Sequence, residues 1–130
     1  MVTLVNEGLE FLAKLACGVS SAPFVDIALG TGSTAEGVTV AYSTVSANII
    51  NSNGGQRAAP ATAAYEADYK ATWTHTWTFS GSLAILQTYI LTSAANGNKM
   101  LCYHKFTSVK NVEVGETLQL TFKMTESRSA

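Results

Sequence analysis

The chain has 130 residues and a mass of 13.7 kDa, with eight basic against nine acidic side chains and a formal net charge of -1. This length, with 47% apolar residues, predicts one domain spanning residues 1–130, and the lack of a basic excess argues against nucleic acid and anionic membranes as partners. Charged residues make up only 13% of the chain, while threonine, serine and alanine number 16, 12 and 18, so we expect a surface of hydroxyls more than ions.

Residues 1–22 predict an N-terminal helical segment that packs on the rest of the domain. Between Leu4 and Cys17 the apolar residues recur mostly at three- and four-residue spacings, which is typical of an amphipathic helix. Glu7, Glu10 and Lys14 interrupt the apolar run, so the segment does not resemble a signal peptide. No stretch is apolar for the length that a membrane span needs, and we expect a protein made in the cytoplasm.

The next forty residues predict a short strand, a possible helix and a long loop. Residues 23–29 (PFVDIAL) form the strand, which ends in a turn at residues 30–33. Residues 38–51 predict a short helix, although their β-branched side chains would also suit a strand. Residues 51–64 (NSNGGQRAAPATAA) have the composition of a loop. Arg57 in this loop could pair with Asp26 and tie the loop to the first strand.

The second half of the chain has the pattern of β-strands. Residues 65–80 predict one long strand, because its side chains alternate between two kinds. One face carries Tyr69, Ala71, Trp73, His75, Trp77 and Phe79, and the other carries Lys70, Thr72, Thr74, Thr76, Thr78 and Ser80. Residues 83–92 are apolar on both sides, as in a central strand covered on both faces. Turns at residues 96–98 and 113–116 separate two further strands, at 99–109 and 117–125.

These elements together predict a mainly β fold. We expect an antiparallel β-sandwich of about five strands, jelly-roll-like, with an N-terminal amphipathic helix and a possible second short helix.

Few side chains suit catalysis or metal binding. The chain has two histidines, two aspartates and no recognisable nucleophile motif, so we expect neither enzymatic activity nor a cofactor. His75 is expected to pack among aromatic residues. Cys102 and His104 share a strand face and could supply two metal ligands, but no further cluster completes a site, and no metal is expected. We expect Cys17 and Cys102 to be buried free thiols, although the sequence leaves a disulfide between them open.

Several short motifs resemble small virion structural proteins of tailed bacteriophages. The turn after the first strand, Gly30-Thr31-Gly32-Ser33-Thr34, is similar to a G-x-G-T-T turn of that family. The C-terminal part is similar to the family's ending, and the matching residues are Gly97, Met100, Leu101, Phe106, Thr107, Gly115, Glu116, Thr117 and Leu118. Residues 85–89 depart from the Ile-Thr-Glu-Ala-Gly segment that the family often has at this place.

This resemblance implies a non-enzymatic component of a virion. We expect a capsid cement or decoration protein that binds the major capsid protein and stabilises the head, as a homo-oligomer with a trimer favoured. The alternative is a tail or fibre component, which could bind carbohydrate or a receptor through surface aromatics. Other candidate contacts are the N-terminal helix and the loop at 51–64. The candidate interaction residues are Tyr69, Thr72, Trp73, Thr74, Thr76, Trp77, Thr78 and Arg57.

Overall fold

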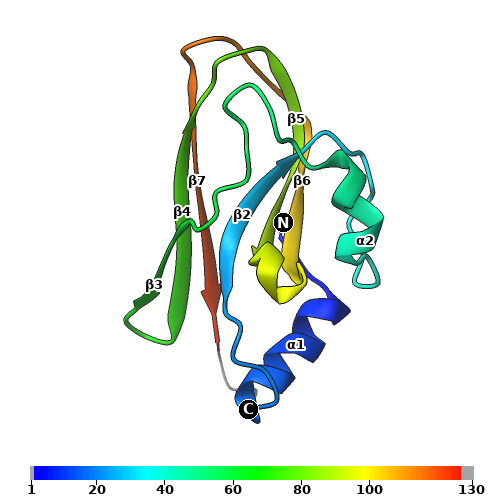
Figure 1. The fold of residues 1–130 in the computed structure, drawn as a ribbon, viewed down its shortest axis with the longest axis vertical. Helices are drawn as coiled ribbons and strands as arrows, with labels where there is room; N and C mark the ends of the chain where they lie inside the picture. The colour runs from blue at the N-terminus through cyan, green and yellow to red at the C-terminus, as the bar shows by residue number, and fades with distance from the viewer. Residues whose placement is uncertain (1, 127–130) are drawn as a thin grey trace.

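The protein forms two antiparallel β-sheets with its helices beside one of them (Figure 1). The structure, a computed structural model, describes residues 2–126. The strands are β1 (Thr3–Leu4), β2 (Phe24–Gly30), β3 (Thr62–Glu66), β4 (Lys70–Thr78), β5 (Leu83–Thr92), β6 (Met100–Val112) and β7 (Thr117–Thr125). The helices are α1 (Asn6–Ala16) and the single-turn α2 (Tyr42–Val45), with short 3-10 turns η1 (Ser46–Asn48) and η2 (Ala94–Asn96). Sheet A has the strand order β1-β6-β5-β2 and sheet B the order β3-β4-β7. The predicted β-sandwich with an N-terminal helix is confirmed.

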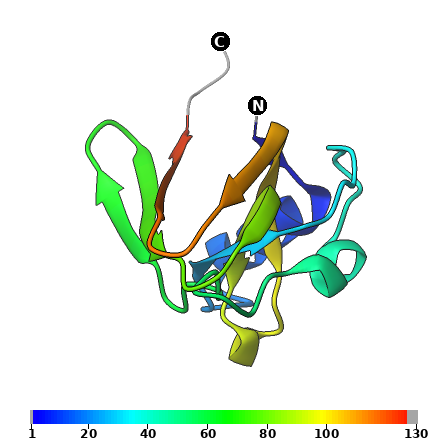
Figure 2. The same cartoon turned by 90° about the horizontal axis from the view of Figure 1, so that it is seen from above.

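The two sheets enclose the main core, as the view from above shows (Figure 2). The aromatic face of β4 points into it, because successive side chains of a strand point to opposite faces. Trp73, Trp77 and Phe79 are at most 6% exposed. His75 on the same face lies edge-on against Trp77, with ring centroids 4.7 Å apart, which confirms that this histidine is packed among aromatic residues.

A second core lies on the opposite side of sheet A. There α2 and the irregular segment 31–41 cover β5, which is therefore buried on both faces as its apolar pattern predicted. Buried side chains hold that segment in place: Gln87 Nε2 donates to the Thr34 carbonyl (2.6 Å), and the Tyr103 hydroxyl donates to the Ala35 carbonyl (2.7 Å). Burial raises the pKa of the Tyr103 phenol, so it remains a hydrogen-bond donor at neutral pH.

The predicted loop at residues 51–64 is ordered for much of its length along the outer edge of β2. Ile27 and Ala58 exchange both backbone hydrogen bonds (3.2 and 2.9 Å), and the Ala61 amide donates to the Val25 carbonyl (2.9 Å). This segment closes the side of the sandwich where β2 approaches β4. Its last residues, from Thr62 on, belong to β3, which the composition of the segment did not predict.

The prediction of one long strand over residues 65–80 is wrong at its start. The chain turns back at residues 67–69, so residues 65 and 66 belong to β3 and only 70–78 to β4. Asp68 and Tyr69 make this turn with φ of +64° each. Left-handed φ values are usual for glycine and occasional for aspartate or asparagine, but rare for a residue as bulky as tyrosine. Side-chain alternation alone therefore could not reveal this hairpin.

Helix α1 lies closer to β6 than most side chains would allow. A Cβ atom added at Gly8 would stand 2.4 Å from the carbonyl oxygen and 2.6 Å from the Cα atom of Leu101. Both obstructing atoms belong to the backbone of β6, which pairs with β1 and β5 and cannot move aside cheaply. Gly8 thus sets the distance between the helix and the sheet.

Replacing Gly8 by alanine is expected to destabilise the protein, because the added methyl group must push α1 away from Leu101. The expected loss is about 1–3 kcal/mol in the free energy of unfolding, measured by urea denaturation. The matched control is Gly37→Ala, since nothing lies within 4 Å of the Cβ position there. Equal stability of the two variants would show that α1 does not depend on this close approach.

Candidate interaction surface

Eight threonines lie on the outer face of sheet B. The pairing register places Thr74 between Thr62 of β3 and Thr121 of β7, and Thr78 directly opposite Thr117. The hydroxyls of Thr74 and Thr121 lie 3.3 Å apart across the two strands. We call this surface the threonine face, and its members are Thr62, Thr72, Thr74, Thr76, Thr78, Thr117, Thr121 and Thr125. All eight are exposed or half-buried, which agrees with the predicted outward direction of the β4 threonines.

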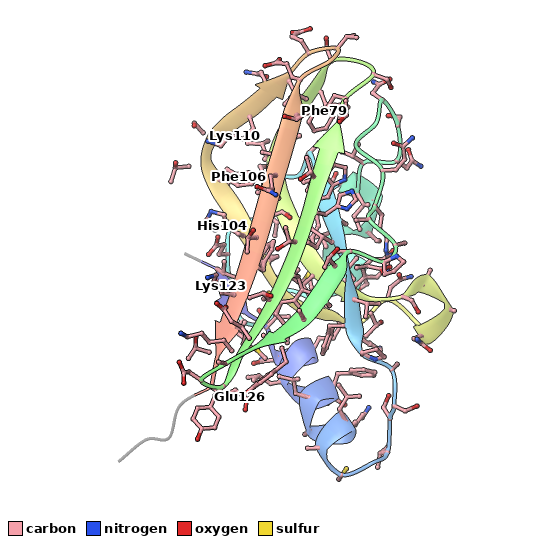
Figure 3. All side chains as sticks on the ribbon, turned by 90° about the vertical axis from the view of Figure 1, so that its left-hand side faces the viewer. Phe79, His104, Phe106, Lys110, Lys123 and Glu126 are labelled. Carbon is pink, nitrogen blue, oxygen red and sulfur yellow. The ribbon has the colours of Figure 1, made fainter. Side chains whose placement is uncertain are left out.

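Charge on the threonine face is confined to the end near the β3–β4 turn. There Lys123 Nζ lies 3.7 Å from Glu66 Oε2, and Lys70 stands opposite Thr125. Along the other half, the partner of Thr76 is the uncharged Gln119. Figure 3 views the molecule from the side of sheet B, with Lys123 labelled on β7. In the half of the face away from that turn, the hydroxyls therefore lie in rows at the strand spacing of about 4.8 Å, without ions between them.

The side chains of Trp73 and Trp77 do not belong to this surface, which corrects the prediction that they do. Both indole rings are buried in the main core, at 6% and 2% exposure. Each N–H donates to a backbone carbonyl of a neighbouring segment, that of Trp73 to Phe24 (2.7 Å) and that of Trp77 to Gln56 (2.8 Å). The rings therefore join sheet B to β2 and to the ordered loop, and they cannot serve as a stacking platform for a sugar.

Arg57 also lies inside the structure, not on an interaction surface as predicted. Its Nε donates to the Asp26 carboxylate at 2.7 Å, which confirms that the two residues pair and that the loop is tied to β2. The guanidinium also donates to the Asn98 side chain and to the Thr92 carbonyl. The side chains of Asp26 and Arg57 are 2% and 17% exposed. One cation thus joins the loop, β2 and the β5–β6 turn.

The β3–β4 hairpin carries the two most exposed aromatic side chains, Tyr65 (77% exposed) and Tyr69 (75% exposed). Tyr69 is the one aromatic residue of the predicted contact set that reaches the surface. The inner side of the hairpin, with Ala63, Ala71 and Tyr65, borders a shallow hollow of about 270 Å³. Exposed tyrosines beside an apolar hollow are typical of protein contacts, because tyrosine combines apolar area with a hydrogen-bonding group.

A second apolar hollow lies where the sandwich is open, between β7 and the strands β1 and β6. It has a volume of about 220 Å³, and its lining includes Leu4, Leu101, Cys102, Phe122 and Met124. Beside this opening the pairing of β5 with β6 is interrupted by a large bulge, in which residues 106–109 stand against one residue of β5. Figure 3 shows the labelled Phe106 and Lys110 of β6 next to β7.

The titratable groups near this opening hold parts of the fold together. Glu36 lies 3.1 Å from His104 Nδ1 and accepts hydrogen bonds from the Lys105 amide (2.7 Å) and the Thr3 hydroxyl (2.7 Å). Burial opposes the charge of Glu36, but the two hydrogen bonds and His104 outweigh it, and the pKa of this carboxyl is below its usual value. Glu36 therefore fastens segment 31–41 to β1 and β6.

Both cysteines are free thiols, as the sequence predicted, but the prediction that both are buried is wrong for Cys17. Cys17 is exposed at the end of α1, whereas Cys102 is buried in β6. Burial raises the pKa of the Cys102 thiol to about 12, so it carries almost no thiolate at neutral pH. Residues 2–126 contain no group of three or more histidine, cysteine, aspartate or glutamate side chains placed to hold a metal ion. No helix in that range has the length and apolar character to cross a bilayer.

Removing one partner of the Asp26–Arg57 pair is expected to cost about 3–5 kcal/mol of unfolding free energy, because the other charge stays buried without compensation. Arg57→Met and Asp26→Asn should each show this loss in urea denaturation, and the double variant should lose less than their sum. The control is Lys14→Met, which breaks the exposed Glu10–Lys14 pair and should cost under about 1 kcal/mol. A loss for Arg57→Met no larger than this control would contradict a structural role for the pair.

Comparisons of the chain with protein-family models, with curated proteins and with solved structures found no match in any of the three. Its function is therefore inferred from its own sequence and surfaces.

Proposed function

We propose that the chain is a non-enzymatic virion structural protein of the tailed-phage type, which decorates the head by binding major capsid subunits. The observation that carries the proposal is the threonine face: eight threonines on the outside of sheet B, with charge only at one end. The sequence resemblance described above suggests the kind of particle. The structure supplies the surface that would make the contact.

A threonine face suits a permanent contact for energetic reasons. Burying a hydroxyl that finds a hydrogen-bond partner costs far less than burying an ion, because ions are much more strongly hydrated. Threonine is also β-branched and stiff, so little side-chain freedom is lost when a partner immobilises it. The strands β4 and β7 pair without interruption over nine residues each, which keeps the hydroxyls in fixed positions. Such a face can be desolvated along its uncharged half.

Decoration would stabilise the shell by mass action. A protein that binds only the assembled state stabilises it by about 2.7 kcal/mol per site at a concentration 100 times the dissociation constant. The bound protein needs no chemistry of its own for this effect. It needs a rigid fold and a complementary face, and the buried Asp26–Arg57 pair and the two cores supply the rigidity.

Charges placed on the threonine face are expected to abolish particle binding without unfolding the protein. In the double variant Thr76→Arg/Thr121→Arg, both new side chains would point outward from exposed positions, so the melting temperature should change little. Affinity for particles lacking the protein, measured by co-sedimentation, should fall at least about tenfold, since two ions would have to be desolvated. The matched control is Thr44→Arg on α2, at the far side of sheet A. An equal loss of particle affinity in the control variant would show that the threonine face is not the contact.

Copy number distinguishes a head protein from a tail or fibre protein. Quantitative mass spectrometry of purified particles should find a number of copies comparable to the number of capsid subunits or their clusters. Particles without the protein should be disrupted at a lower temperature than particles that carry it. A few copies per particle would instead indicate the tail or fibre alternative, and an unchanged disruption temperature would contradict the stabilising role.

A further inference from the structure

Strand β3 forms an edge of sheet B that nothing in residues 2–126 covers. It pairs with β4 on one side only, and all five of its residues are exposed. Figures 1 and 2 both show the β3–β4 hairpin projecting away from sheet A. The backbone groups along the outer edge of β3 are thus available to another strand.

Apart from the charge of Glu66 at its end, this edge also lacks the features by which proteins usually prevent strands from pairing. Protected edges carry lysine, an internal proline or a bulge, or they are covered by a loop. The sequence of β3 is Thr-Ala-Ala-Tyr-Glu, and its register with β4 is continuous over all five residues. The edge of β2 in sheet A, by contrast, is covered by the segment around Ala58. The edge at β2 is therefore covered, whereas the edge at β3 is exposed.

We propose that β3 pairs with β3 of a second copy of the chain, antiparallel about a two-fold axis at Ala64. This register is self-complementary. Tyr65 would stand opposite Ala63 of the second copy, so a large side chain meets a small one. Thr62 would stand opposite Glu66 of the second copy, where a hydroxyl can donate to the carboxylate. The two Glu66 side chains would lie at opposite ends of the paired strands, which avoids repulsion between like charges.

Only the register centred on Ala64 pairs all five residues of β3. Centring the axis on Tyr65 would pair three residues, place the two tyrosines opposite each other and set Glu66 against Ala64. Centring it on Ala63 would also pair three residues and would leave Tyr65 outside the ladder. The Ala64 register therefore forms the most hydrogen bonds and has the best match of side-chain sizes.

The result would be one six-stranded sheet in the order β7-β4-β3-β3-β4-β7. Residues directly opposite each other in an antiparallel pair point to the same face. Thr62, Ala64 and Glu66 of both copies would therefore lie on the side of the threonine face, which would continue from one copy to the other with a Glu66 carboxylate at each end of the seam. The contact itself is independent of the proposed capsid binding, because it uses the edge of the sheet and not its face.

Five paired residues bury less surface than a typical stable interface, so the dimer is expected to be weak. We expect a dissociation constant on the order of 100 μM for the protein alone in solution. The exposed Tyr65 should contribute much of the contact, because a tyrosine buries a large apolar area with few rotatable bonds.

Disulfide trapping tests the register directly. In a Cys17→Ser background, Ala64→Cys places the new thiols of the two copies next to each other at the two-fold axis. The buried Cys102 should not compete for disulfide formation. Mild oxidation is expected to yield a covalent dimer at least about tenfold faster than for the control Thr76→Cys, which lies on β4 on the same face. Equal rates for the two variants, or no dimer from Ala64→Cys, would overturn the proposal.

Sedimentation provides a second measurement without a cross-link. The natural chain and Ala64→Thr should form dimers as the concentration rises, whereas Ala64→Lys should remain monomeric, because two like charges would meet at the axis. Equal melting temperatures would show that both variants fold. Three results would each contradict the pairing. The natural chain could stay monomeric up to about 1 mM, or Ala64→Lys could form dimers as strong as those of the natural chain. The third result is a trimer of the natural chain together with no cross-linked dimer from Ala64→Cys. Dimer formation by Thr76→Arg/Thr121→Arg, whose changes lie on β4 and β7 and not on β3, separates this outcome from failure of the threonine face.

Discussion

The alternation of side chains along β4 is the constraint on which the rest of the structure depends. One set, Trp73, His75 and Trp77, must lie between the sheets because rings of this size are buried most favourably there. The other set must then point outward, since successive residues of a strand face opposite ways. The core therefore fixes the position of the threonine face, and a shift of one residue in register would put the threonines inside and the indoles in water.

The two indoles also determine which side of the sandwich is closed. Their N–H groups donate to Phe24 and Gln56, so the ordered loop and β2 are held against sheet B. The Asp26–Arg57 pair fastens the same loop to β2 at the residue that follows Gln56. The other side of the sandwich, between β6 and β7, remains an apolar hollow. Rigidity is thus concentrated on one side of the molecule.

Much of the fold could be predicted from the sequence because its strands have strong side-chain patterns. The bounds of β7 and the burial of β5 on both faces agree with the prediction, since alternating or continuous apolar residues report burial directly. The β3–β4 turn could not be predicted, because Asp68 and Tyr69 adopt left-handed φ values without glycine. The alanine-rich strand β3 was missed for a related reason, as alanine has low β-propensity and resembles loop composition when no pattern accompanies it.

Some of the predicted contact residues lie on the surface and others are buried, and this difference has a physical cause. Alternation correctly predicts that the threonines and the indoles lie on opposite faces, but it does not tell which face meets the solvent. Burial of Trp73 and Trp77 decides that question. Tyr69 is exposed because it lies in the turn of the hairpin, where the alternation of β4 has already ended. The pairing of Asp26 with Arg57 could be predicted from their opposite charges. The hydrogen bonds from Arg57 to Asn98 and Thr92 could not, because they depend on the position of a turn that is distant in the sequence.

The face and the edge of sheet B together explain how a weak contact could matter on a particle. A dimer joined at β3 would present two threonine faces on one rigid sheet. Two subunits bound to neighbouring sites on a particle would in turn see each other's β3 edge at an effective concentration in the millimolar range. That concentration exceeds the dissociation constant of about 100 μM expected for the edge contact alone. Pairing would then be nearly complete wherever subunits are held side by side, and incomplete in dilute solution. An unprotected edge is a hazard for a protein that acts alone, but in a subunit surrounded by copies of itself, as we propose, it would become the means of their alignment.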